Sequence, residues 1–352
     1  MNDSAVEPAA KEAPRRALPR LSDVAAHAGV SSKTVSRVVN NEANVRPEVR
    51  AQVMRSVAAL GYRPNPAARA LVTQRTHQIG VIATASSLYG PTAGLFSLEQ
   101  AAWKAGYSLT LTTVREASGS ELEEAIQYLV MRGVEGVIIS GVAGIVRLAP
   151  STLAGMPVVS TGPLTEDSAN HVLVDSDQVA GARAAVRHLY DLGHRRIGHL
   201  AGPLTWDAAA RRRDGWLEEV QVLGLVPGPV LEGDWSPKSG YDAALTIDRT
   251  AATAIFVAND HMAMGAIRAF TERGIRVPDD MSVVGFDDVP EAAYQVIPLT
   301  TVHQDFSAVA ERSVRELIHL IEKLDIESNS IHLPIELVAR SSTAPAPTLG
   351  TS

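Results

Sequence analysis

Eleven lysine and arginine side chains lie between residues 15 and 75, where only three aspartates and glutamates accompany them. This segment carries a net charge of +8, whereas the whole chain carries −7. Clustered cations of this kind bind polyanions, because contacts to phosphates release the counterions condensed on nucleic acid. The charges therefore predict a nucleic-acid-binding head on an acidic body, and a solvated basic surface is the alternative.

The basic segment has the hydrophobic spacing of three short helices. The apolar residues with this spacing are Val24, Ala25 and Ala28, then Val35, Val38 and Val39, then Val49, Val53, Val57 and Leu60. The residues at the expected helix boundaries agree with this spacing. Ser22 and Ser31 are expected to be N-caps, and Pro47 is expected in the first turn of the third helix. Gly29 is expected to form the turn between the first two helices, and Gly61 to end the third helix. A further stretch, 67–72, can form a short helix after Asn65 and Pro66, although six residues are marginal without a partner.

Beyond Thr76 the pattern changes to short apolar runs that alternate with amphipathic helices. The runs predict strands at 79–83, 108–114, 136–140, 157–161, 172–174, 197–201, 254–258 and 282–286. The helices are expected at 95–105, 120–132, 178–192, 209–223, 239–247, 262–273 and 306–324. Such alternation is typical of parallel α/β sheets with right-handed crossovers. A series this long favours two doubly wound lobes with a ligand cleft at the carboxyl ends of their strands.

Several classes of protein fit the sequence poorly. The chain has no cysteine, no apolar run long enough to span a membrane and no secretory pattern in its first 20 residues, so we expect a cytoplasmic protein without membrane contact. It also lacks a P-loop, a dinucleotide fingerprint, a nucleophile elbow and a metal-spaced set of His and Glu. We expect no enzyme activity, no cofactor and no metal. An exported solute-binding protein would match the body but not the basic head.

The stretch from Leu21 to Asn40 resembles the helix-turn-helix of the lactose/galactose repressor family. In that arrangement the second helix enters the major groove of double-stranded DNA. The resemblance implies that Ser32, Lys33 and Arg37 read base edges, and that Lys33 and Arg37 donate to guanine. It assigns capping or phosphate contacts to small polar side chains, namely Ser22, Ser31, Thr34, Ser36 and Asn40. Capping and solvation without DNA contact is the alternative for these.

The stretch 63–71 is similar to the hinge helix of the same family, which orders on DNA in a dimer. The resemblance implies that Leu71 wedges into the minor groove, while Asn65 and Ala68 lie against the DNA. Such a wedge kinks the duplex, and the bent DNA then contacts more protein surface. The alternative is that Leu71 packs on the core.

The resemblance to the family continues along the body. It rests on residues 200–204, 212–216, 233–236, 257–263, 283–288 and 299–306. It implies two lobes of the periplasmic-binding-protein type and a sugar effector held by Arg212, Asn259, Asp287, Trp235 and Gln304, with Thr84 and Leu88 lining the other lobe. The family's acidic residue near 160–162 is absent here, so a galactoside is expected less firmly than a sugar. Another effector, such as a purine or a phosphorylated sugar, is the alternative.

The family resemblance also implies an assembly and a division of the chain. We expect a homodimer that binds pseudo-palindromic operator DNA and represses transcription of carbohydrate-utilisation genes under allosteric control by the sugar. The C-terminal residues contain no leucine heptads, so we expect no coiled coil that would join dimers into a tetramer. The expected parts are a disordered arm at 1–18, a helix-turn-helix domain at 19–63, a hinge helix and linker at 64–75, a core at 76–342 and a flexible tail at 343–352.

Overall fold

The computed structural model describes residues 19–115, 119–141, 155–164 and 170–347. The contacts divide the chain into one unit that ends at Thr76 and a second that begins at His77. The expected arm at 1–18 and the last five residues lie outside the described residues. Within the described residues, no helix is long and apolar enough to cross a membrane.

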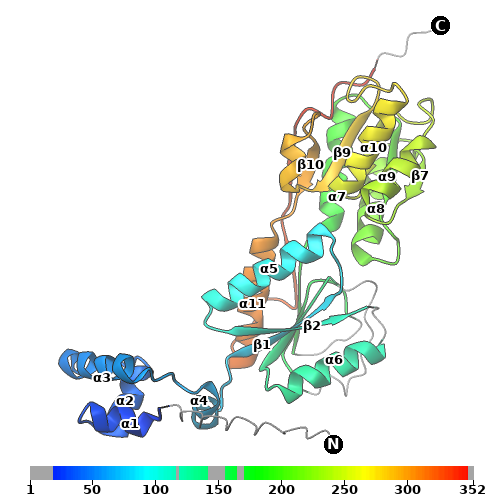
Figure 1. Cartoon of the computed structure of the whole chain (residues 1–352). Helices are drawn as coiled ribbons and strands as arrows, with labels where there is room; N and C mark the ends of the chain where they lie inside the picture. The colour runs from blue at the N-terminus through cyan, green and yellow to red at the C-terminus, as the bar shows by residue number, and fades with distance from the viewer. Residues whose placement is uncertain (1–18, 116–118, 142–154, 165–169, 348–352) are drawn as a thin grey trace, which may run out of the picture. The chain divides into compact units, whose positions relative to one another are not determined.

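The first unit contains four helices (Figure 1). They are α1 (Leu21–His27), α2 (Ser32–Val39), α3 (Pro47–Leu60) and α4 (Pro66–Thr73). The first three pack around a small core that includes Val24, Val35 and Val53, as the hydrophobic spacing predicts. Gly61 ends α3 in the left-handed conformation, with φ of 63°, which a glycine adopts without steric strain.

One boundary of the first unit differs from the prediction. Ser22 does not cap α1, because the helix begins one residue earlier and Ser22 lies inside it, exposed. The Asp23 carboxylate accepts a hydrogen bond from the backbone N–H of Arg20 at 2.7 Å, and this bond fixes the start of the helix. Ser31 does cap α2, where its hydroxyl accepts a hydrogen bond from the backbone N–H of Thr34 at 3.2 Å.

The second unit contains two six-stranded sheets, and each defines one lobe. The strands of the N-terminal lobe, in spatial order, are β11 (Ser330–Leu333), β5 (His171–Ser176), β4 (Val158–Ser160), β3 (Gly136–Ser140), β1 (Gln78–Thr84) and β2 (Ser108–Val114). All their pairings are parallel. The predicted alternation of strands and helices is therefore confirmed for this lobe.

Helices cover both faces of this sheet. They are α5 (Tyr89–Lys104), α6 (Gly119–Met131) and α11 (Phe306–Glu322). Alternate residues of β1 point to opposite faces: Val81 packs with α5 and α11, while Ile82 packs with α6. Figure 1 shows α5 and α6 on opposite sides of β1 and β2. The lobe is doubly wound, as predicted.

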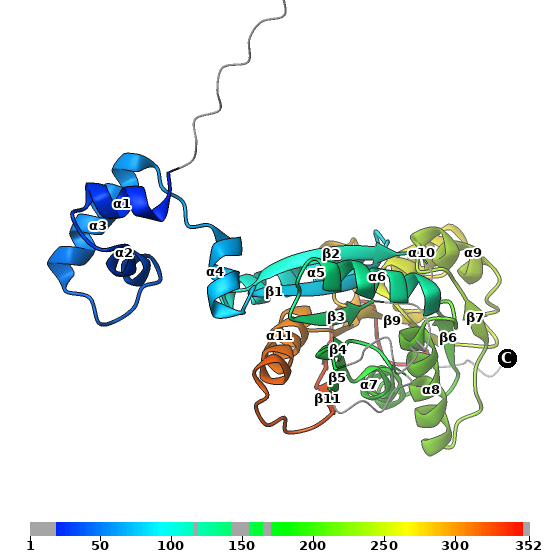
Figure 2. The same cartoon turned by 90° about the horizontal axis from the view of Figure 1, so that it is seen from below.

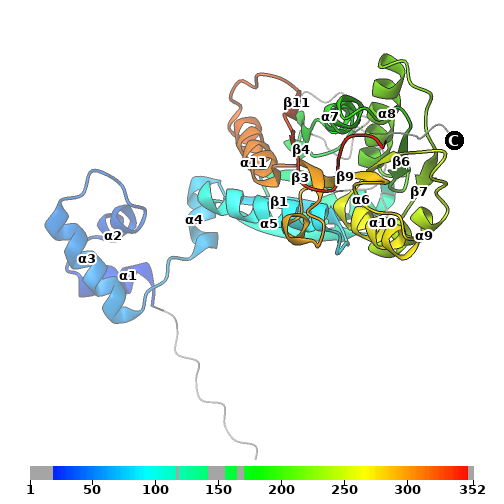
Figure 3. The same ribbon diagram turned by 90° about the horizontal axis from the view of Figure 1, so that it is seen from above.

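The C-terminal lobe repeats this plan with one antiparallel edge. Its strands, in spatial order, are β12 (Glu336–Val338), β10 (Thr300–His303), β9 (Ser282–Asp287), β8 (Ala254–Val257), β6 (Ile197–Ala201) and β7 (Val230–Glu232). Its helices are α7 (Gln178–Asp191), α8 (Asp207–Val222), α9 (Pro237–Leu245) and α10 (Asp260–Glu272), with a 3₁₀ turn at Pro290–Tyr294. Figures 2 and 3 show α9 and α10 on one side of β6 and β9, and α7 and α8 on the other.

The chain passes between the lobes three times. It crosses from β5 to α7, from β10 to α11, and from β11 to β12. The first two crossings end in helices capped by aspartates: Asp177 accepts a hydrogen bond from Ala180 N, and Asp305 accepts one from Ala308 N. The sequence prediction missed β7, β10, β11 and β12, which have only three or four residues each and whose partners lie far away in sequence.

The predicted flexible tail begins too early. Residues 342–346 are bound to the C-terminal lobe by backbone hydrogen bonds and hydroxyl contacts. The Ser342 hydroxyl donates to Val283 O at 2.6 Å, and Ala346 N donates to Leu192 O at 2.8 Å. The segment satisfies polar groups at the end of the sheet that would otherwise be buried without partners.

A buried carboxyl group fixes the loop after β9. Asp260, the first residue of α10, accepts hydrogen bonds from the Thr301 hydroxyl at 2.5 Å and from Val289 N at 2.8 Å. A Cβ at Gly285 would lie 2.1 Å from the Asp260 Oδ1, so only glycine fits beside it. Burial and the neighbouring Asp287 raise the pKa of Asp260 to about 8.

The first prediction concerns this carboxyl. The pKa of Asp260 rises from 3.8 to about 8 on folding, so the folded state holds the proton more tightly than the unfolded state does. The stability that this proton contributes is fully present below pH 3.8 and is lost as the pH rises through about 8. Asp260→Asn has the shape of the protonated acid and should lack this loss. We expect its Tm to rise above that of the wild type progressively between pH 5 and 8.5, as thermal unfolding would measure. A Tm difference from the wild type that is independent of pH would contradict the assignment.

The second prediction concerns the contact between α9 and α10. A Cβ at Gly265 would lie 1.8 Å from the backbone oxygen of Pro237, and a backbone atom cannot move aside like a side chain. Gly265→Ala should therefore lower the free energy of unfolding by about 1–3 kcal/mol. In the control Gly94→Ala, the nearest atom would be 4.0 Å away, so urea unfolding should show no loss. Equal effects of the two variants would show that the close helix contact does not limit stability.

Candidate functional site

The recognition surface of the head is the face of α2 opposite its core. Val35 and Val38 point inward, whereas Ser32, Lys33 and Arg37 are exposed together on the other side. The Arg37 Nε lies 3.6 Å from the Glu42 Oε2 in an exposed ion pair that is worth little in solution. Two exposed cations on one helix are therefore available to an acidic partner.

The small polar residues of the head have partners within the helix. The hydroxyls of Ser31 and Thr34 are 2.9 Å apart, and Asn40 Nδ2 donates to the Ser36 Oγ at 3.3 Å. These bonds stabilise the two ends of α2. They agree with the capping role expected for these residues, while their contact to DNA stays a prediction.

Arg50 is a basic residue of the head with a structural role that the charge count did not reveal. Its guanidinium donates to the Asn41 Oδ1 at 2.9 Å and to Glu42 O at 2.5 Å. It also reaches Val38 O at 3.3 Å. Arg50 therefore holds the turn after α2, and part of the +8 charge serves the fold rather than a partner.

The helix α4 exposes its apolar side chains. Leu71 and Val72 are each 84% exposed, and the insertion of Leu71 into the minor groove stays a prediction. Ala68, one turn earlier, is also exposed, and Asn65 lies just before the first residue of the helix. An exposed leucine on a short helix has the form expected of a wedge.

A cleft lies between the two lobes of the second unit, with an empty volume of about 1210 Å³ that includes its open mouth. It opens at the carboxyl ends of strands from both sheets, as predicted. Six of the seven expected effector residues line it: Leu88, Arg212, Trp235, Asn259, Asp287 and Gln304. Thr84, the last residue of β1, is not among the residues that line it.

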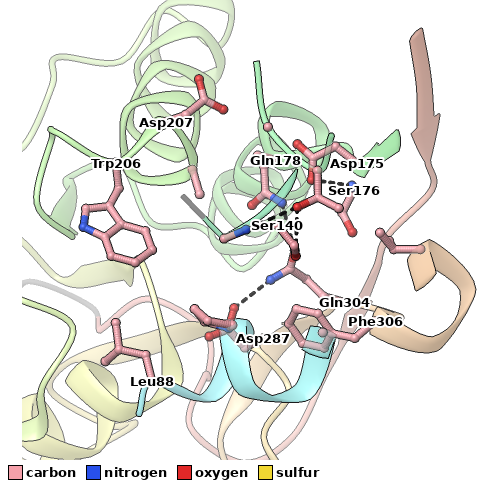
Figure 4. Close-up of a pocket in the computed structure, with 18 of the residues that line it drawn as sticks. Leu88, Ser140, Asp175, Ser176, Gln178, Trp206, Asp207, Asp287, Gln304 and Phe306 are labelled. Atoms are coloured by element: carbon pink, nitrogen blue, oxygen red, sulfur yellow. Dashed lines mark hydrogen bonds between the residues drawn. The ribbon is translucent and has the colours of Figure 1, made fainter. Parts of the chain in front are cut away.

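Four side chains form a closed circuit of polar contacts in the cleft. Arg212 donates from Nε to the Gln178 Oε1 at 2.8 Å, and Gln178 Nε2 donates to the Gln304 Oε1 at 2.8 Å. Gln304 Nε2 donates to the Asp287 Oδ1 at 2.8 Å, and that oxygen lies 3.4 Å from the Arg212 Nη2. Figure 4 shows the contacts of Gln304 with Gln178 and Asp287. All four side chains are buried.

The circuit balances two opposite charges that are buried side by side. Burial lowers the pKa of Arg212 and raises that of Asp287, and each group opposes the shift of the other. The Arg212 guanidinium also donates to Ala258 O at 2.5 Å and lies 3.8 Å from the centre of the Phe286 ring. The pair is thus fully bonded rather than isolated, which a buried ion pair requires.

Trp235 and Asn259 form the adjoining wall. Asn259 caps α10 by accepting a hydrogen bond from Met262 N at 2.9 Å, and its Nδ2 donates to Trp235 O at 3.1 Å. Trp235 has φ of 74°, an unusual conformation for a large residue, and its indole packs over Gly202, where a Cβ would lie 2.4 Å from the ring. The surrounding contacts therefore fix the indole at the wall.

The sequence prediction missed several lining residues. These are Ser140, Asp175, Ser176, Gln178, Trp206, Asp207 and Phe306. A weak signal was present for some: Asp175 and Ser176 directly follow the predicted strand 172–174, and Trp206 and Asp207 follow the stretch 200–204 that carried the resemblance. Gln178 had none, because its role depends on a contact with Gln304, 126 residues away. No cluster of His, Cys, Asp and Glu suited to a metal occurs among the described residues.

Comparison with known proteins matches both units. Residues 20–65 match the model of bacterial regulatory proteins of the lacI family, and residues 186–343 match a periplasmic binding protein-like domain. The chain is 34% identical to the lactose operon repressor of Escherichia coli K12, over 92% of this chain and 90% of that protein. It is 33% identical to the transcriptional repressor PurR of Mannheimia succiniciproducens, over 92% of this chain and 98% of that one.

Solved structures agree with these matches. The Lac repressor dimer bound to operator and the anti-inducer ONPF has a TM-score of 0.82 and 33% identity, over 93% of this chain and 99% of that chain. A complex of the transcriptional regulator CelR with cellobiose has a TM-score of 0.67 and 31% identity, over 92% of this chain and 99% of that chain. The chain therefore belongs to the lacI family of bacterial regulatory proteins and is a DNA-binding transcription regulator.

Proposed function

We propose that this protein is a homodimeric repressor whose binding to pseudo-palindromic operator DNA is controlled by a neutral sugar in the cleft. The observation that carries the effector class is the charge of the lining. Among the described lining residues, the carboxylates Asp175, Asp207 and Asp287 accompany one arginine, Arg212. The donors of that arginine already bind Gln178, Ala258 and Asp287.

This arrangement suits hydroxyl groups better than anions. A phosphorylated effector needs free cations, and the carboxylates would repel it. Carboxylates, amides and a buried guanidinium can exchange hydrogen bonds with adjacent hydroxyls, and the indole of Trp235 offers an apolar wall for the ring. A galactoside is the first candidate, because the lactose operon repressor is among the relatives. A purine is the second candidate effector, because several relatives are named PurR.

The position of the circuit supports control of the lobes by the proposed effector. Gln178 follows the first crossing between the lobes, and Gln304 lies within the second. A sugar that exchanges bonds with these two side chains changes the contacts at the crossings themselves. The effector then favours one lobe arrangement by the difference in its affinity for the two arrangements. In a dimer, the lobe arrangement sets whether two heads can reach two half-sites.

The third prediction tests the function as a whole. Fluorescence anisotropy at fixed salt would measure binding of the full chain to a set of labelled pseudo-palindromic duplexes with a central CG step. We expect specific binding that lactose or a related glycoside weakens at least tenfold. Specific binding that no sugar changes, but that adenine or guanine changes, would replace the sugar with a nucleobase. No specific duplex would contradict the proposed operator binding.

The fourth prediction concerns the head. With the duplex found above, Lys33→Ala and Arg37→Ala should each weaken specific binding by about 1–3 kcal/mol and relax the preference at one base pair, because each removes a donor to a base edge. Leu71→Ala should weaken specific binding without changing base preference in the half-sites, since a wedge acts on DNA shape. The control Arg55→Ala, on α3, should leave the base preference unchanged. If the Lys33 and Arg37 variants also left the base preference unchanged, the prediction that these two side chains contact base edges would be wrong.

A further inference from the structure

The cleft contains two separate polar clusters, and neighbouring arginines of α8 supply one to each. Successive side chains leave a helix about 100° apart, so Arg211 and Arg212 point to different places. Arg212 belongs to the circuit with Gln178, Gln304 and Asp287. Arg211 instead holds two carboxylates of the lining, which come from both lobes.

The second cluster is built around the guanidinium of Arg211. Its Nη1 lies 2.6 Å from the Asp175 Oδ2 and 3.6 Å from the Asp207 Oδ2. Asp175 is the penultimate residue of β5 in the N-terminal lobe and is buried, and its other oxygen accepts a hydrogen bond from Ser176 N at 2.7 Å. Asp207 is the first residue of α8 in the C-terminal lobe. Both carboxylates line the cleft.

A second indole lines the cleft next to Trp235. Trp206 precedes Asp207 in sequence, is only partly buried and lines the cleft. Its ring centre lies 6.2 Å from that of Trp235, and the two planes make an angle of 79°. In Figure 4 the Trp206 indole lies to one side of the hydrogen bonds that join Gln178, Gln304 and Asp287. Two perpendicular apolar faces therefore adjoin two polar clusters.

Trp235, whose ring centre lies 5.6 Å from the Arg212 Cζ, also carries an unused hydrogen-bond donor. Its side chain is 6% exposed, and no acceptor among the described residues bonds its indole Nε1. A buried donor without a partner is unfavourable by about 1–3 kcal/mol unless a ligand supplies an acceptor. A ring oxygen or hydroxyl of a sugar has this chemistry.

We infer that the cleft has a second sugar subsite, formed by Trp206, Asp207 and Asp175, and that the effector is a disaccharide or longer glycoside. This inference rests on the proposed control by a sugar. The first ring binds at Trp235 and the Arg212 circuit, and the second ring lies against Trp206 and donates hydroxyl hydrogen bonds to the two carboxylates.

The experiment compares glycosides that differ by one ring. Isothermal titration calorimetry on the full chain would measure Kd for lactose against methyl β-D-galactoside, and for cellobiose against methyl β-D-glucoside. We expect at least one disaccharide to bind about tenfold more tightly than its methyl glycoside. Trp206→Ala should remove most of this difference by weakening the disaccharide, and should leave the methyl glycoside within about twofold. Trp206→Phe, which keeps an aromatic face, should restore part of it.

Two further variants sharpen the result. Asp207→Asn should weaken the disaccharide selectively, because it removes a charged acceptor and keeps the shape. Trp103→Ala, 76% exposed on α5 and outside the cleft lining, should change neither affinity. The second subsite would be overturned if each methyl glycoside bound as tightly as its disaccharide, both in the wild type and in Trp206→Ala. The proposal that the cleft binds a sugar would then still stand. A chain that binds none of the four sugars, while its operator binding responds to a nucleobase, would overturn both.

Discussion

The contact between Arg212 and Asp287 is the interaction on which the core depends. Removing two charges from water is unfavourable by several kcal/mol for each ion, and their attraction offsets this only when further hydrogen bonds satisfy the remaining polar atoms. Gln178, Gln304 and the backbone of Ala258 supply those bonds. Because Gln178 and Gln304 lie at two crossings between the lobes, satisfying one buried guanidinium also fixes how the chain passes from lobe to lobe.

A closed circuit has a consequence for any ligand. Each glutamine of the circuit uses one N–H and one oxygen lone pair, and a primary amide has two of each, so a sugar can either add hydrogen bonds or replace those present. When a sugar replaces a hydrogen bond of the circuit, the buried group that loses its partner must bond to the sugar instead, because an unpaired buried polar group is unfavourable. The affinity for the sugar is therefore sensitive to small changes in the position of the lobes. Under the proposed function, sugar binding and lobe geometry would therefore be coupled through the same four side chains.

The sequence predicts well those features whose causes are local. Ser31 caps α2 and Gly61 ends α3 because each bond or backbone angle involves residues only a few positions away. Arg212 and Asp287 were predicted through the family resemblance. Gln178 and Trp206 were not, since their importance arises where distant segments meet. The buried Asp260 illustrates the same limit: its sequence position suggests an exposed first turn, and only the packing of Gly285 and Thr301 against it shows otherwise.

The low stability of the hinge helix α4 is a second physical constraint on the proposed control of DNA binding. An eight-residue helix with an exposed leucine is marginal by itself, so α4 gains little stability from its own contacts. Operator DNA and a second copy of the chain would supply the missing contacts and also bear the entropy of ordering, about 1–2 kcal/mol for each residue fixed. The free energy of specific binding would then be a small difference between the favourable contacts and this entropy. Under the proposed function, an effector would need to remove only a few contacts at one hinge to shift that difference, so four buried side chains in the core could govern a DNA complex through a short connecting helix.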